Sequence, residues 1–479
     1  MNLKQTEKNM ETVDVFKNGS EVSLEQVLDN REWRSAKQTK LENGFPRATI
    51  VAVKLNLPGN VKNSAKIQQF FNAGWRILLA SLNGWPIQSI ELDISRPTGP
   101  EGFVVVSKDI NRVKQVAIRF EESFPLGRFF DSDVMAKEAE GYQLSRQELG
   151  FEARRCFVCD ENAKACAKAG RHSFDELRQA VNHTYEQYFV QDPFLPYWDE
   201  RSVVEAATFA CLAEVVTNPK PGLVDPVSMG AHDDMDVDTF IDSSLALQPY
   251  FKECITAGRT FKKEQLTELL ALIRPAGLAA EQAMKVATNG VNTHKGAIFT
   301  LGILIAAYGY CTQDQKSTTL SFVQKAVSAM GAHLLLENEK VADRSSQELT
   351  AGQVQYQKYR LAGVRGEVYE GLVPLSDVAL PALRKSEGTT NERLLDTLMA
   401  IAAAITDSTL VKRAGDPAIN QEMIAWVAEF QKLGGAQTSA GMTFLSHLDQ
   451  TFISRHLSIG GAADYLILTA FIARLMGLI

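Results

Sequence analysis

Residues 290–296, GVNTHKG, bring two glycines, a histidine and Lys295 together immediately before an apolar run over residues 297–310. A glycine-rich turn that opens a buried helix leaves backbone N–H groups free at the positive end of the helix dipole. The pattern therefore predicts an anion-binding site at the start of a core helix. The alternative is that Gly290 and Gly296 only shape a tight connection between two helices.

Residues 230–236, GAHDDMD, place one histidine and three aspartates within five residues. The sequence that follows predicts a helix, and one aspartate is explained as its N-terminal cap. The other two carboxylates would repel each other unless a cation or a substrate compensates their charge. This segment is therefore a candidate for metal binding or base catalysis.

Three other connections in the same half of the chain carry polar residues. They are the stiff turn PKPGLVD at 219–225, Asp407 with Lys412 and Arg413, and SIGGAAD at 458–464. Each alone is explained by helix capping or turn formation. Together they combine cationic, carboxylate and amide groups, which predicts a site for a metal-bound polyphosphate.

In the first half of the chain, Asp131 and Asp133 lie two residues apart in a stretch, residues 127–135, that predicts a strand. Alternate residues of a strand point to the same face, so both carboxylates aim at one spot. Mg²⁺ usually takes one or two protein carboxylates together with phosphate oxygens, and the neighbouring Arg128 is suited to hold such phosphates. The alternative is a solvated strand end, which the flanking aromatic residues disfavour.

Cys156, Cys159 and Cys166 are followed by His172, so three thiols and one imidazole fall within 17 residues. Such a set suits a tetrahedral Zn²⁺ site with a structural role, because four protein ligands leave no open position on the metal. A small helical turn with buried free thiols explains the same pattern equally well.

A chain of 479 residues favours two or three domains. Up to residue 135 the periodic patterns predict strand, helix, strand, strand, helix and strand, which is the order of a split βαβ sandwich. From residue 201 onward helical spacing replaces the strand signals, and prolines and aromatic residues over 183–200 indicate the boundary. We expect a multidomain protein with an α+β domain over 1–185, split βαβ or nucleotidyltransferase-like, and an all-α domain over 198–479.

The bulk properties exclude several classes of protein. A net charge of −7 and a pI near 5.7 offer no broad attraction for nucleic acid or acidic lipid. The N-terminal residues lack a continuous apolar segment, and no run is long enough to span a bilayer, so we expect a cytoplasmic protein with no membrane partner. Six cysteines in such a compartment are expected to be thiols or metal ligands.

Taken together and in order, several segments resemble known motifs. PKPGLVD, GAHDDMD, GVNTHKGAIFTLG, TDS and GGAAD, over about residues 200–479, resemble the motif set of triphosphoribosyl-dephospho-CoA synthase. REWRSAKQ, LNLPGNVK, GRFFDSDV and RRCFVCDENAKACAKAGRH, over roughly residues 25–180, are similar to apo-citrate lyase phosphoribosyl-dephospho-CoA transferase. The whole chain resembles the bifunctional fusion that makes and installs the prosthetic group of citrate lyase.

The resemblance implies two reactions. In the C-terminal domain, the 2′-hydroxyl of 3′-dephospho-CoA attacks the anomeric ribose carbon of ATP and adenine leaves, through an oxocarbenium-like state. In the N-terminal domain, a serine of the citrate lyase acyl carrier (gamma) subunit attacks the α-phosphate of the triphosphoribosyl group and pyrophosphate leaves. Both reactions are expected to use Mg²⁺.

With that chemistry in mind, residues are assigned to roles. Candidates for catalysis are His232, Asp233, Asp234 and Lys295 in one domain and Asp131 and Asp133 in the other. Candidates for substrate binding are Arg128, Lys220, Gly222, Asn292, His294, Arg413, Gly460 and Gly461. Candidates for Mg²⁺ binding are Asp131, Asp133, Asp234, Asp236 and Asp407, and those for structural Zn²⁺ are Cys156, Cys159, Cys166 and His172.

Two alternatives stay open at this point. One is the same chemistry directed to the carrier protein of malonate decarboxylase, which the accepted carrier would distinguish. The other is a non-catalytic protein that only docks the lyase, which an assay for free adenine would distinguish.

Overall fold

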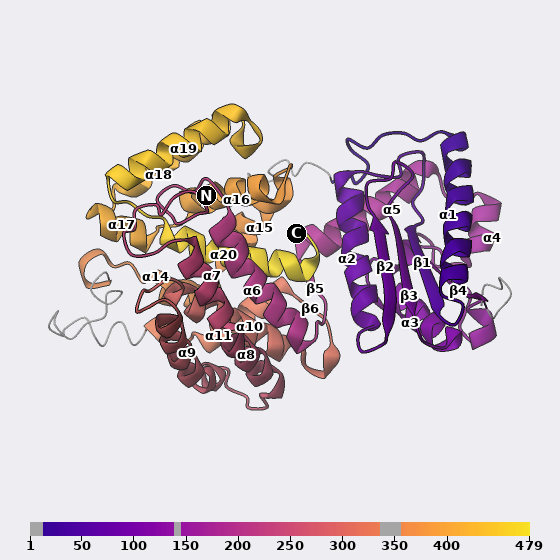
Figure 1. Cartoon of the computed structure of the whole chain (residues 1–479), viewed down its shortest axis with the longest axis horizontal. Coiled ribbons are helices and arrows are strands. Elements are labelled where there is room, and N and C mark those ends of the chain that lie inside the picture. The colour runs from indigo at the N-terminus through magenta and orange to yellow at the C-terminus, as the bar shows by residue number, and fades with distance from the viewer. Residues whose placement is uncertain (1–12, 138–144, 336–355) are drawn as a thin grey trace, which may run out of the picture. The chain divides into compact units, whose positions relative to one another are not determined.

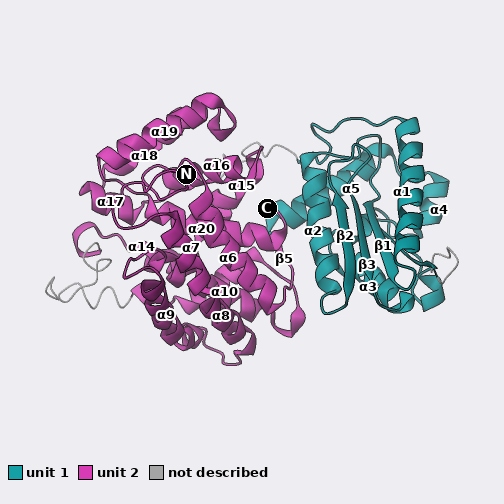
Figure 2. Cartoon of the chain, viewed as in Figure 1, with its two compact units in different colours: residues 1–193 teal, residues 194–479 magenta. Residues whose placement is uncertain are grey.

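The computed structural model describes residues 13–137, 145–335 and 356–479. The chain divides into two compact units, residues 1–193 (unit 1) and residues 194–479 (unit 2), which Figure 2 shows in different colours. The division falls inside residues 183–200, where prolines and aromatic residues replace periodic patterning.

A four-stranded antiparallel sheet forms the centre of unit 1 (Figure 1). Its strands lie in the order β2-β3-β1-β4, and two helices make the connections, α2 (Ala65–Ser81) from β1 to β2 and α3 (Ile110–Ser123) from β3 to β4. The strands are β1 (Thr49–Leu55), β2 (Ile87–Asp93), β3 (Glu101–Val106) and β4 (Phe130–Ala136). These elements occur close to where the sequence predicts them, in the order of a split βαβ unit.

The predicted last strand is wrong at its start, because Gly127–Phe129 form a 3₁₀ turn (η1) and β4 begins only at Phe130. A Cβ at Gly127 would lie 2.6 Å from the carbonyl oxygen of Phe120 in α3. The chain therefore passes close against that helix before it extends, and only glycine fits at this distance.

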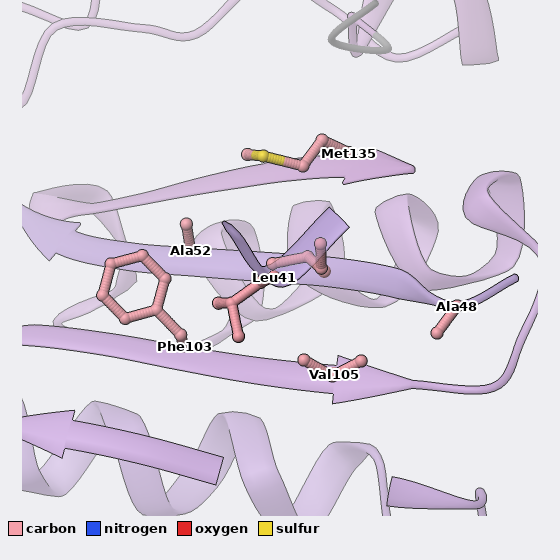
Figure 3. Packing of buried hydrophobic residues seen from close by; sticks show 7 residues of the cluster. Leu41, Ala48, Ala52, Phe103, Val105 and Met135 are labelled. Carbon is pink, nitrogen blue, oxygen red and sulfur yellow. The ribbon is translucent and has the colours of Figure 1, made fainter. Parts of the chain in front are cut away.

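Helix α1 (Leu24–Gly44) covers one face of the sheet. Ser23 and Gln26 form a capping box at its start. Leu41 packs with apolar strand residues in a core cluster that Figure 3 shows: Ala48, Ile50, Ala52, Phe103, Val105 and Met135. The opposite face packs against α2 and α3, where the ring of Phe130 lies 5.8 Å from that of Phe71. The rest of unit 1 comprises η3 (Gln147–Leu149), α4 (Ala163–Ala169), α5 (Phe174–Glu186) and a π-helical turn, η4 (Gln187–Gln191).

Unit 2 is built almost wholly from helices around α10 (Lys295–Cys311), whose residues from Ala297 to Gly309 are nearly all buried. The predicted apolar core helix is therefore present. The surrounding helices are α6 (Glu200–Val216), α7 (Val237–Ala246), α8 (Gln248–Thr260), α9 (Thr267–Ala287), α11 (Leu320–Met330), α14 (Gly363–Glu370), α15 (Leu380–Lys385), α16 (Thr390–Ala404), α17 (Ser408–Ala414), α18 (Ile419–Lys432), α19 (Ser439–Ser454) and α20 (Gly460–Met476).

The helices of unit 2 differ from those that the periodicity of the sequence predicts. Residues 238–255 form two helices, α7 and α8, and residues 391–411 form α16 and α17 with a break at 405–407. Helices α14, α15 and α19 were not predicted. A short strand pair, β5 (Phe194–Leu195) with β6 (Thr318–Thr319), also belongs to this unit. Among the described residues no single helix is long and apolar enough to cross a bilayer, although α16 and α17 reach that length and composition together across a 69° bend.

Candidate functional site

The carboxylates of β4 belong to a row of charged residues that crosses the sheet of unit 1. Asp131 pairs in register with Lys54 of β1, and Lys54 pairs in register with Glu101 of β3. Asp133 lies two residues further along β4 and therefore faces the same side as Asp131. This is the side that α1 covers, since Arg34 of α1 contacts both Glu101 and Asp133. The sequence prediction that both aspartates share one face is confirmed.

Cations from α1 and β1 lie beside these carboxylates. Arg34 is buried, forms an ion pair with Glu101 and lies 3.3 Å from Asp133. Burial raises the pKa of Glu101, and the charge of Arg34 opposes that rise. Lys54 Nζ lies 3.5 Å from Asp131 Oδ2. Each carboxylate of the row thus has a cationic neighbour, which offsets the cost of removing it from water.

A group of arginines from outside the sheet also lies near Asp131. Arg154 Nη1 lies 3.6 Å from Asp131, and Arg154 also pairs at 2.6 Å with the buried Glu121, which Arg146 contacts at 2.9 Å. Burial and then the charges of Arg154 and Arg146 lower the pKa of Arg128, so the third guanidinium is close by. Arg128 is therefore near Arg154, the arginine that contacts Asp131, although no contact joins Arg128 itself to either aspartate among the described residues. Adjacent guanidinium groups and carboxylates suit a phosphate-bearing substrate with a divalent cation.

Sequence reasoning missed four cations of this site: Arg34, Lys54, Arg146 and Arg154. Lys54 was detectable, because it is the one charged residue in the predicted strand 48–57. The other three come from outside the sheet, and only the fold brings them to β4.

The four predicted zinc ligands of unit 1 also converge. One ligand atom from each of Cys156, Cys159, Cys166 and His172 lies within 4.8 Å of the others. The cluster follows Arg154 directly in the chain, and the ring of Phe157 lies 4.8 Å from that of Phe129 in η1. The cysteine cluster is therefore close to the charged site on β4.

In unit 2 three of the predicted polar segments are joined by hydrogen bonds. The N–H of Ala231 donates to the carbonyl of Gly222 at 3.2 Å. Arg413 Nη1 donates to the carbonyl of Ala231 at 2.8 Å, and its Nη2 lies 3.2 Å from Nδ1 of His232. Burial and then Arg413 lower the pKa of His232, which favours the neutral imidazole. The predicted proximity of 219–225, 230–236 and the end of α17 is thus present.

Two residues predicted to bind substrate are instead buried in the protein. Lys220 is fully buried, pairs with Glu214 and donates to the Glu214 carbonyl at 2.6 Å. His294 is 2% exposed, and its Nδ1 lies 2.7 Å from Ser243 Oγ. Burial and then the charge of Lys220 lower the pKa of His294 to about 3, so the imidazole is neutral at pH 7. Neither side chain presents a cation to a bound phosphate in this structure.

The backbone amides predicted to bind phosphate are also partly engaged. The N–H of Gly222 donates to Asp449 Oδ1 at 2.9 Å. At the start of α20, the N–H of Ala462 donates to Asp407 Oδ2 at 2.9 Å, and a Cβ at Gly461 would lie 3.1 Å from that carboxylate. Asp407, not a phosphate, thus occupies the helix N-terminus that Gly460 and Gly461 open.

Three carboxyl groups of unit 2, those of Glu367, Asp407 and Asp464, influence one another electrostatically, and we call them the carboxylate cluster. Asp407 is 1% exposed and caps α17, accepting from the N–H groups of Thr409 and Leu410. Asp464 of α20 lies at the start of α10, where a Cβ at Gly296 would be 1.9 Å from its Oδ2. Glu367 comes from α14.

Burial raises the pKa of each carboxyl in the cluster, and repulsion between carboxylates adds to this rise for Glu367 and Asp464. For Glu367 the pKa rises to about 7, through burial, then Asp407, then Glu370. Burial and then Glu367 and Asp407 raise the pKa of Asp464 well above its ordinary value. Burial raises that of Asp407, and hydrogen bonds from backbone amides oppose it. Within the described residues no ion pair compensates this cluster, so its carboxyl groups need either protons or another positive charge.

The remaining predicted residues of unit 2 are exposed. Asp233, Asp234 and Asn292 lie at the surface. Asp236 caps α7 in a capping box with Thr239, so it is the one aspartate of its segment that capping explains. Lys295 is 59% exposed and pairs at 3.0 Å with Glu281 of α9.

Sequence reasoning missed Glu367 and gave Asp464 no role. Asp464 had a signal, because it is the one charged residue between Leu457 and Ala473 in a strongly apolar segment. A charge within a buried helix is costly and usually has a function or a partner. Glu367 had no such signal in the sequence, because a glutamate in a short amphipathic helix is ordinary.

Two protein families match the chain. The family described as ATP:dephospho-CoA triphosphoribosyl transferase, CitG, matches residues 200–478. The family described as apo-citrate lyase phosphoribosyl-dephospho-CoA transferase, CitX, matches residues 22–188. Each match lies within one structural unit.

Among relatives, Protein CitXG of Leuconostoc mesenteroides subsp. cremoris is 46% identical over 471 residues, covering 97% of this chain and 100% of the relative. Protein CitXG of Haemophilus influenzae is 33% identical over 474 residues, 96% of this chain and 97% of the relative. A probable 2-(5''-triphosphoribosyl)-3'-dephosphocoenzyme-A synthase of Lactiplantibacillus plantarum is 46% identical over 278 residues, covering 57% of this chain and 97% of the relative.

Proposed function

The chain belongs to the family of bifunctional proteins in which a CitX region precedes a CitG region, and from this premise we propose how its two units divide the chemistry. It is a bifunctional transferase of citrate lyase maturation. The CitG region synthesises triphosphoribosyl-dephospho-CoA, and the CitX region transfers the prosthetic group to the apo acyl carrier protein. The finer chemistry below is our proposal.

In unit 2 the 2′-hydroxyl of 3′-dephospho-CoA attacks the anomeric carbon of ATP. The new C–O bond forms as the bond from that carbon to adenine breaks, and the triphosphate stays on the ribose. The hydroxyl loses a proton to a carboxylate, and adenine gains one as it leaves. Charge that develops on the ribose is stabilised by a nearby carboxylate.

The observation that supports this assignment most is the carboxylate cluster. Glu367, with a pKa raised to about 7, is suited to exchange a proton near neutral pH. Asp407 and Asp464 have no ion-pair partner among the described residues, and their negative charge would stabilise the positive charge that develops on the ribose. Mg²⁺ binding by Asp407 stays a prediction, because both of its oxygens accept backbone N–H groups in this structure. Asp233, Asp234 and Lys295 stay predictions for catalysis, with Asp234 also a prediction for metal binding.

In unit 1 the serine hydroxyl of the carrier attacks the α-phosphate of the triphosphoribosyl group. A phosphodiester bond forms, the bond to the β-phosphate breaks, and pyrophosphate leaves. Asp131 and Asp133 would hold Mg²⁺, which neutralises the phosphate oxygens when bound. Arg154 and Arg128 are suited to bind the phosphates, because Arg154 lies beside Asp131 and Arg128 is near Arg154.

The test uses the full chain with ATP, 3′-dephospho-CoA and Mg²⁺, and measures free adenine. Adenine release that requires both substrates supports the unit 2 reaction, and its absence contradicts it. Adding apo acyl carrier subunits then tests unit 1 through a mass increase on one serine and release of pyrophosphate. Labelling of a malonate decarboxylase carrier but not of the citrate lyase carrier would contradict the proposed partner. A second test uses variants: Lys295→Ala and Asp234→Ala should each stop adenine release.

A further inference from the structure

The cysteine cluster has the geometry of a metal site and not that of a disulfide. The Sγ atom of Cys166 lies 3.6 Å from that of Cys156 and 3.7 Å from that of Cys159. In a tetrahedral site with Zn–S bonds of about 2.3 Å, two sulfur ligands are about 3.8 Å apart, whereas a disulfide has about 2.05 Å. Two sulfur pairs have this spacing and the third pair lies within 4.8 Å, so the three thiols are placed to share one ion.

The fourth residue has an atom that lacks a partner. Nε2 of His172 is buried, and no hydrogen bond to it is present among the described residues. An unpaired polar atom away from water is costly unless something else satisfies it. A ring nitrogen of His172 is within 4.8 Å of all three sulfur atoms, so coordination to a metal would remove this cost.

Backbone contacts already hold the loop in a shape that supports thiolate ligands. The N–H of Val158 points to the Sγ of Cys156 at 3.5 Å, as a donor that stabilises a thiolate would. The N–H of Cys156 donates to the carbonyl of Glu161 at 2.6 Å. The N–H of Ala163 donates to the carbonyl of Arg154 at 2.9 Å, which links the loop to the residue that contacts Asp131.

We propose that Cys156, Cys159, Cys166 and His172 bind one Zn²⁺, and that this ion fixes the position of Arg154 beside Asp131. Four protein ligands leave no open position, so the ion is structural and separate from any reaction metal. The first part stands on the cluster alone. The second part rests on the function proposed for unit 1, because it concerns the site that would receive the phosphates.

The metal is tested on the full chain purified under reducing conditions without added metal. We expect about one zinc per chain by elemental analysis, because structural zinc binds tightly. Cys156→Ser and Cys166→Ser should each contain less than a tenth of that amount, while the matched control Cys311→Ser, a cysteine of unit 2, should keep it. Cobalt substitution should give the absorption of a tetrahedral cobalt thiolate in the wild type and not in Cys166→Ser.

Two results would overturn the site. One is a reduced chain that holds no zinc and takes up none when zinc is added. The other is intact-mass analysis of the native protein showing the loss of two hydrogens in Cys159 and Cys166 with no bound metal, which would make the pair a disulfide.

The positioning role is tested with a chelator selective for zinc over magnesium. Carrier labelling should fall at least tenfold while adenine release is unchanged, and added Zn²⁺ should restore it. Thermal unfolding of unit 1 should shift to lower temperature in the same samples. Unchanged labelling after complete zinc loss would overturn the positioning role and leave the metal site intact. No labelling by the zinc-loaded protein would instead contradict the function proposed for unit 1.

Discussion

In unit 1 each carboxylate near β4 lies beside a lysine or an arginine, whereas in unit 2 the carboxylate cluster has no ion-pair partner among the described residues. The first site is built on strands, whose alternation puts Asp131 and Asp133 on one face. The second is built where helices begin, and backbone N–H groups instead of side chains face Asp407. The site of unit 1, where carboxylates and cationic side chains are paired, is suited to phosphates. The cluster of unit 2, where the carboxylates have no such partners, needs a cation or a proton.

The largest effect that this contrast predicts is in unit 1. The double variant Asp131→Asn, Asp133→Asn should lower carrier labelling by about 10³-fold or more, because it removes the predicted ligands of the reaction metal. Adenine release should be unchanged. Asp93→Asn, a matched change on β2 at the far edge of the sheet, should have little effect on either reaction. Loss of both activities in the double variant would mean that the two sites are not independent.

A smaller loss is expected in unit 2. Asp464→Asn keeps the size of the side chain but removes its charge, so adenine release should fall by about 10²-fold while labelling with supplied triphosphoribosyl-dephospho-CoA is kept. Asp396→Asn is the control, because burial also raises the pKa of Asp396 and that residue accepts a hydrogen bond from the N–H of Ala436. Equal losses in both variants would indicate a folding defect and not a catalytic one.

The unmatched charge should also appear as a pH dependence. If Glu367 accepts the proton, adenine release should rise with pH through about 7, and Glu367→Gln should remove that limb. The folded state holds the Glu367 proton more tightly than the unfolded state, so this group makes the free energy of unfolding fall as pH rises from about 4.5 to about 7. Chemical denaturation of the substrate-free protein at several pH values checks the second effect, which should be weaker in the variant. A pH profile that is identical in both proteins would contradict the assignment.

The smallest predicted effect concerns the contacts between loops. Arg413→Ala removes the bonds to the carbonyl of Ala231 and to His232, so kcat/KM for adenine release should fall about tenfold. Lys412→Ala removes an exposed neighbouring charge and should act within about twofold of wild type. Steady-state kinetics of both variants separates the two. Equal kinetics in the two variants would mean that the loop contact is not needed.

The contrast between the units also explains what could be predicted from the sequence. The strands and helices of unit 1 follow from local periodicity, and the pairing of Asp131 with Asp133 follows from the two-residue repeat of a strand. The cationic partners of that pair could not be predicted in this way. Arg34 is 99 positions from Asp133 and Arg154 is 21 positions from it, and only the fold brings them together.

In unit 2 the sequence predicts the polar loops but not the burial of two of their side chains. Lys220 and His294 look like surface ligands in sequence, yet the tertiary structure buries both. The break between α16 and α17 was missed since residues 405–407 interrupt the apolar pattern only briefly. Helix α19 had a signal that was overlooked: its buried residues Gly441, Leu445, Leu448 and Phe452 recur at intervals of four, three and four.

The contact between Gly296 and Asp464 has a consequence for how this protein can diverge. Any side chain at position 296 would place a carbon 1.9 Å from Oδ2 of Asp464, so the carboxylate would have to swing away from α10. Even the methyl group of an alanine at position 296 would push the Asp464 carboxylate out of its place. Substitution at position 296 therefore constrains which residues fit at position 464. A shift of α10 along α20 by one residue would break the contact between Gly296 and Asp464.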